Sequence, residues 1–577
     1  MPVINQELAR IFDRIADALE LKGETGFRVF AYRKAARVLA DLTEDVGELD
    51  KANRLETIPG IGAGIAKKIH EYLTTGRMKK LEEAVSGLEP GLFTLLEIPG
   101  VGPKTVKLVF EKLGVKDLDG LKKVLGDGSL AKLPGMGDKK AENILKGIEA
   151  AEHSGERMYL NEADELAQSI IEHLRKGPQV KKVAVAGSLR RGKETIGDID
   201  ILATGDNPQE IIHQFITYSF VRQVVSAGDT KASILVGTGT GVRQVDLRVV
   251  ASDAFGAALQ YFTGSKDHNI ALRSMAQKLG LKISEYGVFK GKRRLGGKTE
   301  TEVYRSLGLP YIEPELREDR GEIEAAKRGS LPKLIRLEDI KSDLHIHTDA
   351  SDGSSSLEEV VGACRQRGYS HIAIAEHSVS AGYAGGLRED ELLKRCDEID
   401  RFNSKLKGFR VLKSAEVDIM TNGKLDYSES TLARLDLVIT SIHQGFTKDA
   451  TSRICSAIAH PLVHLIAHPS GRLIGKRRGY EIDLEKVIEH AARFHKVLEI
   501  NSYYARLDLN DIWARKAKEA GVLLAINTDA HAVVDLNWMR YGVITGRRAW
   551  LGKKDVINCL PLDNLMKLLY QITRRSV

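Results

Sequence analysis

The chain of 577 residues contains few cysteines and no long apolar run. Its four cysteines, all in the C-terminal half, lie far apart and include no C-x-x-C pair: Cys364, Cys396, Cys455 and Cys559. This spacing is typical of reduced, buried cysteines in a cytoplasmic protein rather than of a disulfide framework. No stretch approaches the roughly 20 consecutive apolar residues that cross a bilayer. We therefore expect a soluble protein, and at roughly 100 to 200 residues per domain we expect three to five domains.

The sequence also lacks a strong excess of charge of either sign. The chain has 86 basic and 79 acidic residues, a net charge of +7, which is only a weak indication of nucleic-acid binding. The N-terminus is an amphipathic stretch with acidic residues and lacks the basic region and apolar run of a signal peptide, so none is expected. Any interaction with DNA must therefore be argued from local motifs.

One such motif occurs three times in the first 150 residues. Each copy has an apolar residue, the pattern P-G-x-G and a lysine-rich stretch with helical periodicity, at residues 58–69, 98–109 and 133–144. Glycine permits a tight turn and leaves backbone N–H groups bare where the next helix begins, so a phosphodiester can approach without meeting a side chain. The repetition favours DNA-backbone binding over a simple turn between helices. The glycines concerned are Gly60, Gly62, Gly100, Gly102, Gly135 and Gly137.

Three aspartates in apolar surroundings predict a first metal site. In residues 183–202 an apolar strand leads into a Gly-Ser turn, and a second strand carries Asp198 and Asp200 on one face. A third strand, residues 243–250, offers Asp246. Acids within apolar strands are costly unless cations neutralise them, and oxygen ligands favour magnesium. Two such ions can hold the attacking and leaving oxygens of a phosphoryl transfer.

The C-terminal part of the chain, about residues 340–577, predicts a second, different metal site. Seven short apolar strands alternate with helices, which is typical of a somewhat irregular parallel barrel of the TIM type. Polar residues collect at the strand ends, where such barrels have their active sites. Imidazoles with carboxylates suit zinc, manganese or iron, and nine ligands imply two or three ions. The nine are His345, His347, Asp352, His377, Glu416, His443, His468, Asp529 and His531.

The three P-G-x-G copies resemble helix-hairpin-helix motifs, and residues 27–39 with 58–83 resemble the small N-terminal domain of family X DNA polymerases, the relatives of DNA polymerase beta. In that domain a lysine attacks the deoxyribose at an abasic 5' end, and Lys68 falls on the matching position. A nucleophilic amine must be neutral, and we expect the neighbouring basic residues Arg28, Arg33, Lys34 and Lys67 to lower its pKa. The alternative role for Lys68, a phosphate contact, stays open.

The resemblance to family X polymerases extends over the first 315 residues. Gly187, Ser188, Arg190, Arg191 and the three aspartates match the palm motif of the family. The resemblance implies that the aspartates hold two magnesium ions and that Ser188 and Arg191 hold the triphosphate of the incoming nucleotide. It also implies that Asp246 takes the proton from the primer 3'-hydroxyl.

Residues 261–276 resemble the nucleotide-binding segment of the same family. The resemblance places the backbone at Tyr261 and Phe262 against the sugar, which disfavours a ribose 2'-hydroxyl, and it makes Asn269 and Arg273 contacts of the base and the template. Lys266 replaces an acidic residue common in vertebrate members and predicts an added cationic contact. These residues, with the glycine between the aromatic pair and the lysine, form the predicted nucleotide site: Tyr261, Phe262, Gly264, Lys266, Asn269 and Arg273.

The barrel half resembles the PHP domain, named for polymerase and histidinol phosphatase, whose motifs stand here in order. The resemblance implies a 3'–5' exonuclease and related cleavage at 3' ends or abasic sites, in a bacterial or archaeal type of repair polymerase. Manganese or zinc is the implied metal. Two alternatives remain: a structural PHP domain behind an active polymerase, and a phosphoesterase that acts mainly on small phosphates.

Together these observations predict a multidomain α+β and α/β protein that acts on gapped or primed DNA with deoxynucleoside triphosphates, as a monomer and without a membrane. The expected order is a helical N-terminal region, a nucleotidyltransferase palm with a thumb, and a distorted seven-stranded barrel. The predicted boundaries are a lyase-like domain at 1–88, fingers with two further hairpins at 89–155, palm at 156–255, thumb at 256–318, a linker at 319–340 and the PHP domain at 341–577.

Overall fold

The structure, a computed structural model, describes residues 3–24, 26–42, 46–51, 53–58, 60–96, 98, 101–137, 140–141, 144–145, 148, 157–239 and 241–575. Contacts divide the chain into two units. The first holds residues 1–156, 219–228 and 232–245, and the second holds residues 157–218, 229–231 and 246–577. None of the described helices is long and apolar enough to cross a membrane.

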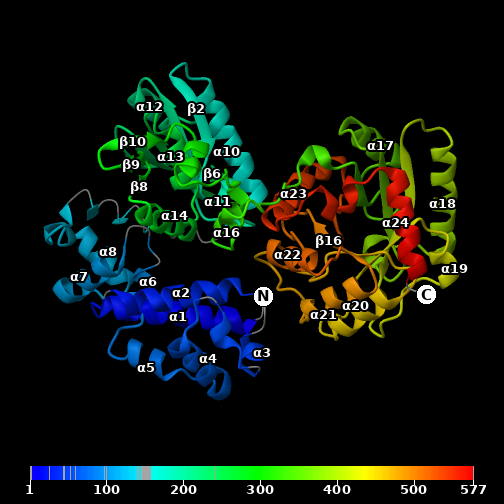
Figure 1. The fold of residues 1–577 in the computed structure, drawn as a ribbon, viewed down its shortest axis with the longest axis horizontal. Helices are drawn as coiled ribbons and strands as arrows, with labels where there is room; N and C mark the ends of the chain where they lie inside the picture. The colour runs from blue at the N-terminus through cyan, green and yellow to red at the C-terminus, as the bar shows by residue number, and fades with distance from the viewer. Residues whose placement is uncertain are drawn as a thin grey trace. The chain divides into compact units, whose positions relative to one another are not determined.

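The described part of the first 148 residues is helical (Figure 1). In α1 (Val3–Leu21), Leu8, Phe12, Ile15 and Leu19 recur at helical spacing and are buried, so the helix packs its apolar face against α2. The other α-helices of this region for which the structure describes both ends are α2 (Phe27–Asp41), α3 (Val46–Lys51), α4 (Ala63–Thr75), α5 (Lys79–Val85), α6 (Gly91–Leu95), α7 (Pro103–Leu113) and α8 (Leu118–Gly126).

A five-stranded sheet with the order β2-β4-β7-β6-β5 follows in the chain. β2 pairs antiparallel with β4, and the helix α10 (Leu160–Arg175) buries Ala163, Ala167, Ile170 and Leu174. The strands and the two other helices here are β2 (Val180–Val185), α11 (Gly187–Arg190), β4 (Ile199–Gly205), α12 (Pro208–Ile216), β5 (Val221–Ala227), β6 (Lys231–Thr238) and β7 (Gly241–Val249); β1 (Met158–Tyr159) pairs with β3 (Thr195–Ile196).

Residues 255–327 build a small α+β region with its own apolar core. Val288, Val303, Tyr304 and Ile312 lie at its centre. Its elements are α13 (Phe255–Thr263), α14 (Lys266–Lys278), the three-stranded sheet β8 (Lys282–Ser284), β9 (Gly287–Lys290) and β10 (Arg293–Gly296), α15 (Glu300–Ser306), and α16 (Glu322–Lys327).

Seven parallel strands in sequence order form the C-terminal sheet, and β11 contacts β17, so the sheet nearly closes into a barrel. The predicted fold class is therefore confirmed, including the number of barrel strands. The strands are β11 (Ser342–Ile346), β12 (His371–His377), β13 (Arg410–Asp418), β14 (Leu437–Ser441), β15 (Leu465–Ile466), β16 (Val497–Asn501) and β17 (Leu524–Asn527).

Helices cover the outside of this barrel. Most strand residues are buried on both faces, which explains the continuous apolar runs of the sequence. The main helices are α17 (Leu357–Gln366), α18 (Glu389–Asn403), α20 (Ala450–Ala459), α21 (Leu484–Arg493), α22 (Asp511–Glu519), α23 (Met539–Arg548) and α24 (Leu562–Arg575), with the short α19 (Glu429–Leu432).

Candidate metal centres

The three aspartates of the first predicted metal site lie on or directly beside two neighbouring strands. Asp200 is on β4 and Asp246 is on β7, the next strand of the sheet. Asp198 directly precedes β4, which begins at Ile199, so it lies one residue outside the strand in which we expected it. Asp198 and Asp246 both act electrostatically on Asp200. The sheet therefore gathers the three predicted carboxylates at one place.

Burial and electrostatic repulsion between the three aspartates raise the pKa of two of them. Burial, together with the charges of Asp198 and Asp246, raises the pKa of Asp200 to about 7. Burial and the charge of Asp246 also raise the pKa of Asp198. Carboxylates that repel one another in this way become stable as anions when a cation lies between them. The donor set therefore fits magnesium.

A short helix and its glycine set the turn beside the aspartates. Gly187 begins α11 with a φ of 62°, a left-handed conformation that favours glycine. A Cβ at Gly187 would overlap with Oδ2 of Asp200. Ser188 follows on α11. The G-S sequence therefore lets the turn approach the carboxylates closely.

Two arginines after this turn are held by acids of the neighbouring region. Arg190 forms a forked pair with Glu300 through Nη1 and Nη2, at 2.8 and 2.6 Å. Arg191 donates from Nε to Glu318 Oε1 at 3.1 Å and from Nη1 to the carbonyl of Thr263 at 2.5 Å. The sequence did not identify Glu300 or Glu318 as partners, because each lies more than 100 residues away in the chain.

The predicted nucleotide segment forms α13, a glycine turn and α14. The rings of Tyr261 and Phe262 meet edge to face with centroids 5.1 Å apart. Asn269 donates to the carbonyl of Tyr261 at 2.7 Å, which ties the two helices together. Gly264 takes a φ of 72°. Lys266, the first residue of α14, and Arg273 are exposed.

In the N-terminal unit, Lys68 lies on α4 and donates to the carbonyl of Gly64 at 2.8 Å. Its Nζ lies 5.9 Å from the centre of the Tyr32 ring. Burial lowers the pKa of Lys68, followed by the charge of Lys80 and, more weakly, of Lys67. Arg33, which we expected to contribute, instead pairs with Glu20 at 2.9 Å and with Asp17. The predicted lowering of the pKa is therefore present, but burial rather than the neighbouring basic residues is its first cause.

The described glycines of the P-G-x-G turns divide into two conformations. Gly60 and Gly135 have φ of 103° and 76°, and Gly137 has a φ of 57°. Gly62 and Gly102 precede α4 and α7 with φ of −92° and −95°. Gly100 lies outside the described residues.

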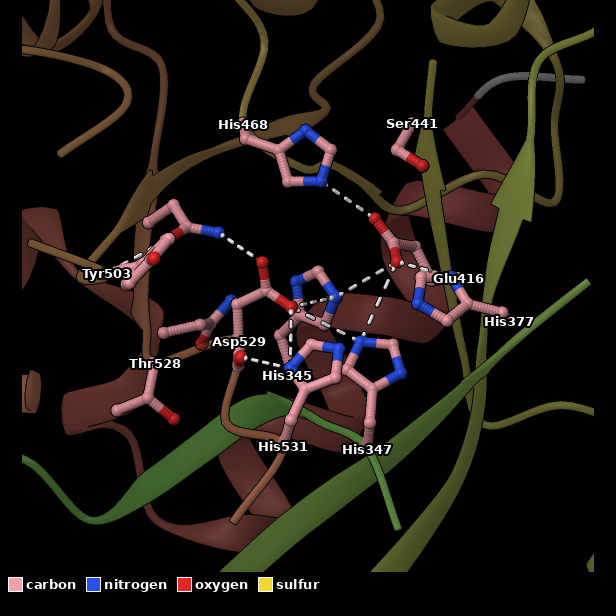
Figure 2. A network of polar contacts seen from close by, with 12 residues as sticks. His345, His347, His377, Glu416, Ser441, His468, Tyr503, Thr528, Asp529 and His531 are labelled. Atoms are coloured by element: carbon pink, nitrogen blue, oxygen red, sulfur yellow. Dashed lines mark hydrogen bonds and ion pairs between the residues drawn. The ribbon is translucent and has the colours of Figure 1, made fainter. Parts of the chain in front are cut away.

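All nine residues of the second predicted site meet at one end of the barrel. Eight of them form three groups whose ligand atoms lie within 4.8 Å of one another: His347 with Asp352, His377 and His531; His345 with His347 and Asp529; His377 with Glu416 and His443. His468 joins through a 2.9 Å contact between its Nε2 and Glu416. Figure 2 shows the imidazoles converging on Glu416 and Asp529.

Glu416 lies at the centre because of the strand register. β12 and β13 pair with His377 beside Glu416, and His377 Nδ1 lies 3.1 Å from Glu416 Oε2. The second oxygen, Oε1, lies 3.4 Å from His443 Nε2. Asp529 Oδ1 similarly lies 3.3 Å from His347 Nε2 and 3.6 Å from His345 Nε2. Each of these two carboxylates thus faces more than one imidazole.

Several ligand atoms here are buried without a hydrogen-bond partner. These atoms are His345 Nε2, both ring nitrogens of His347, His377 Nδ1, His468 Nδ1 and Glu416 Oε2. Buried polar atoms normally have partners, so such a group implies another species in contact with them. Burial and the neighbouring His377 lower the pKa of His347 to about 3, which keeps it neutral, as a metal ligand must be. The residues therefore fit two or three transition-metal ions.

The backbone also marks this site. His468 and Asp529 have positive φ of 29° and 56°, a conformation that costs free energy for residues other than glycine. Both residues follow barrel strands and turn toward the centre (Figure 2). Such strain persists where the surrounding structure requires it, as at functional sites.

Glu499 is a supporting residue that sequence reasoning missed. It is buried on β16, and its Oε1 lies 2.9 Å from His345 Nδ1, while its Oε2 accepts from the backbone N of His468 at 2.9 Å. Asn501 similarly donates to Asp529 Oδ2 at 3.0 Å. The available signal was a carboxylate within the apolar run V-L-E-I-N, residues 497–501.

Five models of known protein families match successive segments of the chain. A helix-hairpin-helix domain matches residues 3–78, and a SAM-like helix-hairpin-helix tandem matches residues 93–150. The DNA polymerase beta palm matches residues 157–245, the DNA polymerase beta thumb matches residues 258–318, and the PHP domain matches residues 343–510. Asp246 directly follows the palm match, and Asp529 and His531 lie 19 and 21 residues beyond the end of the PHP match, so their assignment depends on the geometry above.

One of three curated relatives extends this similarity over nearly the whole chain. "DNA polymerase/3'-5' exonuclease PolX" of Bacillus subtilis is 38% identical over 569 residues, 98% of this chain and 99% of the relative. DNA polymerase lambda of Rattus norvegicus is 30% identical over 344 residues, 54% of this chain and 56% of the relative. DNA polymerase lambda of Arabidopsis thaliana is 27% identical over 350 residues, 55% of this chain and 62% of the relative.

A carboxylate triad on a polymerase-beta-type palm, followed by a histidine-rich PHP barrel, defines a nucleotidyltransferase joined to a metal-dependent phosphoesterase domain. The chain belongs to the family X DNA polymerases that carry a C-terminal PHP domain.

Proposed function

We propose that this chain is a DNA-directed DNA polymerase that fills short gaps during DNA repair, and that its PHP domain is a 3'–5' exonuclease. The observation that carries the proposal is the presence of both residue sets in one chain that is similar over its full length to a polymerase with exonuclease. Processing of 3' ends and abasic sites belongs to the same proposal, since these also require phosphodiester cleavage.

In the polymerase reaction, Asp198, Asp200 and Asp246 would hold two magnesium ions, which would supply charge neutralisation at the triphosphate and activation of the primer hydroxyl. Asp246 accepts the proton of the 3'-hydroxyl. Ser188 and Arg191 bind the phosphates, and the backbone at Tyr261 and Phe262 excludes a ribose 2'-hydroxyl.

In the barrel, the nine side chains would hold two or three manganese or zinc ions, which would supply charge neutralisation at the phosphate that is cleaved. His347 serves as a neutral ligand, as the lowered pKa indicates. Glu416 contacts imidazoles with both oxygens, so both of its oxygens would be available as metal ligands. The unpartnered buried atoms favour a loaded, active barrel over a purely structural one.

A gapped duplex with a labelled primer tests both activities. With magnesium and nucleotides, Asp198→Asn plus Asp200→Asn should abolish extension, whereas His345→Ala plus His347→Ala should retain it. With manganese and no nucleotide, His345→Ala plus His347→Ala should abolish digestion, whereas the aspartate variant should retain it. Loss of both activities in either variant, with the fold retained, would contradict two separate sites. Digestion of small phosphate esters in preference to the primer would favour the phosphoesterase alternative.

A second candidate activity is 5'-deoxyribose phosphate lyase, favoured by the lowered pKa of Lys68. The neutral amine is the nucleophile, so the reaction should reach its plateau below the ordinary lysine pKa of 10.5. Borohydride should trap the protein on an abasic 5' end, and Lys68→Ala should lose trapping while Lys67→Ala retains it. Equal trapping by Lys68→Ala would assign Lys68 to phosphate binding instead.

The expected monomeric state and the expected cytoplasmic location stay predictions. Four buried free cysteines support the cytoplasmic location.

A further inference from the structure

A buried arginine of the PHP domain contacts the turn that carries the triphosphate-binding residues. Arg548 is 6% exposed at the end of α23. Its Nη1 donates to the backbone carbonyl of Arg191 at 2.7 Å, and its Nη2 donates to Asp511 Oδ2 at 2.8 Å. The donor and the carbonyl are 357 residues apart in the chain, so this hydrogen bond joins the barrel half to the palm.

Arg548 and Arg191 also share one acceptor. Glu318 Oε1 accepts from Arg191 Nε at 3.1 Å and from Arg548 Nη1 at 3.0 Å. Burial opposes the charge of Glu318, yet Arg548, Lys193 and Arg191 hold the pKa of Glu318 low, at about 2, so it is an anion at neutral pH. When Arg191 moves to a phosphate, the charge of Arg548 remains on Glu318. A buried carboxylate would otherwise be left unpaired, which is costly.

Two further contacts hold the same turn. Gly192 has a φ of 64°, and a Cβ there would overlap with Cγ2 of Ile544 on α23. Arg472 donates to both carboxylate oxygens of Glu194, at 3.3 and 2.7 Å, and to the carbonyl of Leu507. Side chains of the PHP domain therefore contact residues 191–194 at three points: the carbonyl of Arg191, Gly192 and the carboxylate of Glu194.

We propose that Arg548 is a positioning residue of the polymerase site: it fixes the turn at residues 191–194 and provides the countercharge that lets Arg191 leave Glu318 for the nucleotide. The PHP domain thus completes the polymerase site as well as carrying its own. This inference rests on the proposed role of Arg191 at the triphosphate. Beyond that role, the inference states that a side chain of the PHP domain, Arg548, determines the affinity of the polymerase site for the nucleotide.

Arg548→Lys tests the inference in the full chain, with single-nucleotide insertion on a gapped duplex and magnesium. Lysine keeps a charge but loses the forked geometry that reaches three acceptors. We expect the KM for the nucleotide to rise about ten-fold, the cost of a buried charge-assisted hydrogen bond, with kcat changed less than about three-fold. Exonuclease activity in manganese should persist, which shows that the barrel is folded.

Arg547→Lys is the matched control, because Arg547 is adjacent on α23 but pairs with Glu315, at 2.7 Å, rather than with the turn. Its nucleotide KM should stay within about two-fold of wild type, a difference smaller than the about 1.4 kcal/mol of a ten-fold change. An unchanged KM in Arg548→Lys, or an equal rise in both variants, would overturn the inference. Arg191→Met should raise the KM more than either variant, and if it does not, the proposed triphosphate role fails as well.

A second pair keeps the inference testable if Arg548→Lys does not fold. Gly192→Ala should raise the nucleotide KM because the new Cβ meets Ile544. Adding Ile544→Ala removes the obstructing methyl group and should recover part of the affinity. Recovery through a PHP residue supports the positioning role, whereas no recovery overturns it.

Discussion

The orientation of single imidazole rings decides whether the barrel can hold metal ions. Glu499 contacts Nδ1 of His345, so Nε2 of that ring faces Glu416 and Asp529. A ligating histidine whose other nitrogen binds a carboxylate is fixed in tautomer and direction. The same carboxylate holds the backbone of His468. Glu499 therefore orients two of the nine predicted ligands without being one of them.

Glu499→Gln should lower exonuclease activity about 10- to 100-fold, because an amide orients and polarises the imidazole less well than a carboxylate. Polymerase activity in magnesium should not change. The matched control is Glu489→Gln, an exposed glutamate on α21. Metal content measured by atomic absorption should fall with activity in the Glu499 variant. Full activity in that variant would contradict the orienting role.

Asp200 should make the metal-free protein sensitive to pH. Its pKa in the fold, about 7, lies above the ordinary 3.8, so the folded state favours the protonated acid. Stability is therefore lost as the pH rises from 3.8 through about 7 and is regained when magnesium binds. In chelator, Asp200→Asn should raise the thermal midpoint by roughly 2 to 4 °C at pH about 8 and leave it unchanged near pH 3. A lower midpoint for the variant at pH about 8 would contradict the raised pKa.

At the scale of elements, the first P-G-x-G turn assigns different tasks to its two glycines. Gly60 has a φ of 103°, and a Cβ there would lie 2.9 Å from Lys34 Cε and 3.1 Å from Val38 Cγ2. Gly62 has an ordinary φ of −92°, and a Cβ there meets nothing within 4 Å. The first glycine thus permits the turn, whereas the second leaves space outside the protein where a phosphate can approach.

Gly60→Ala and Gly62→Ala should therefore differ in their effects. Gly60→Ala should destabilise the first unit by about 1 kcal/mol or more, because alanine is strained at positive φ. Gly62→Ala should leave thermal stability unchanged but weaken binding to gapped DNA several-fold, independently of base sequence. Scanning calorimetry and fluorescence anisotropy measure the two quantities. Equal DNA affinity in Gly62→Ala and wild type would refute the phosphate contact at this turn.

Regular elements and short motifs were predictable from the sequence, whereas long-range partners were not. The seven apolar runs predicted the seven barrel strands because period and length are local properties. Strand ends then placed His377 and Glu416 side by side through the register. Glu318, which joins Arg191 to Arg548, left no local pattern, since its partners lie 127 and 230 residues away. Burial of an ion pair depends on tertiary packing and not on neighbours in the chain.

At the scale of the whole molecule, the proposed function gives two different metal sites one substrate, the DNA 3' end. Three carboxylates suit magnesium at the palm, and imidazoles with carboxylates suit manganese or zinc in the barrel. The buried bridge through Arg548 and Glu318 connects the two catalytic parts. Variants that remove either primer extension or primer digestion therefore show whether each activity depends on the other.

The most direct test is a time course on one gapped duplex with magnesium and manganese, which compares wild type with two variants. Asp198→Asn plus Asp200→Asn should shorten the primer and never extend it. His345→Ala plus His347→Ala should extend the primer to the end of the gap and never shorten it. Wild type should show both products, with digestion prevailing when nucleotides are absent. Extension by the aspartate variant, or digestion by the histidine variant, would contradict the assignment of two separate active sites to this chain.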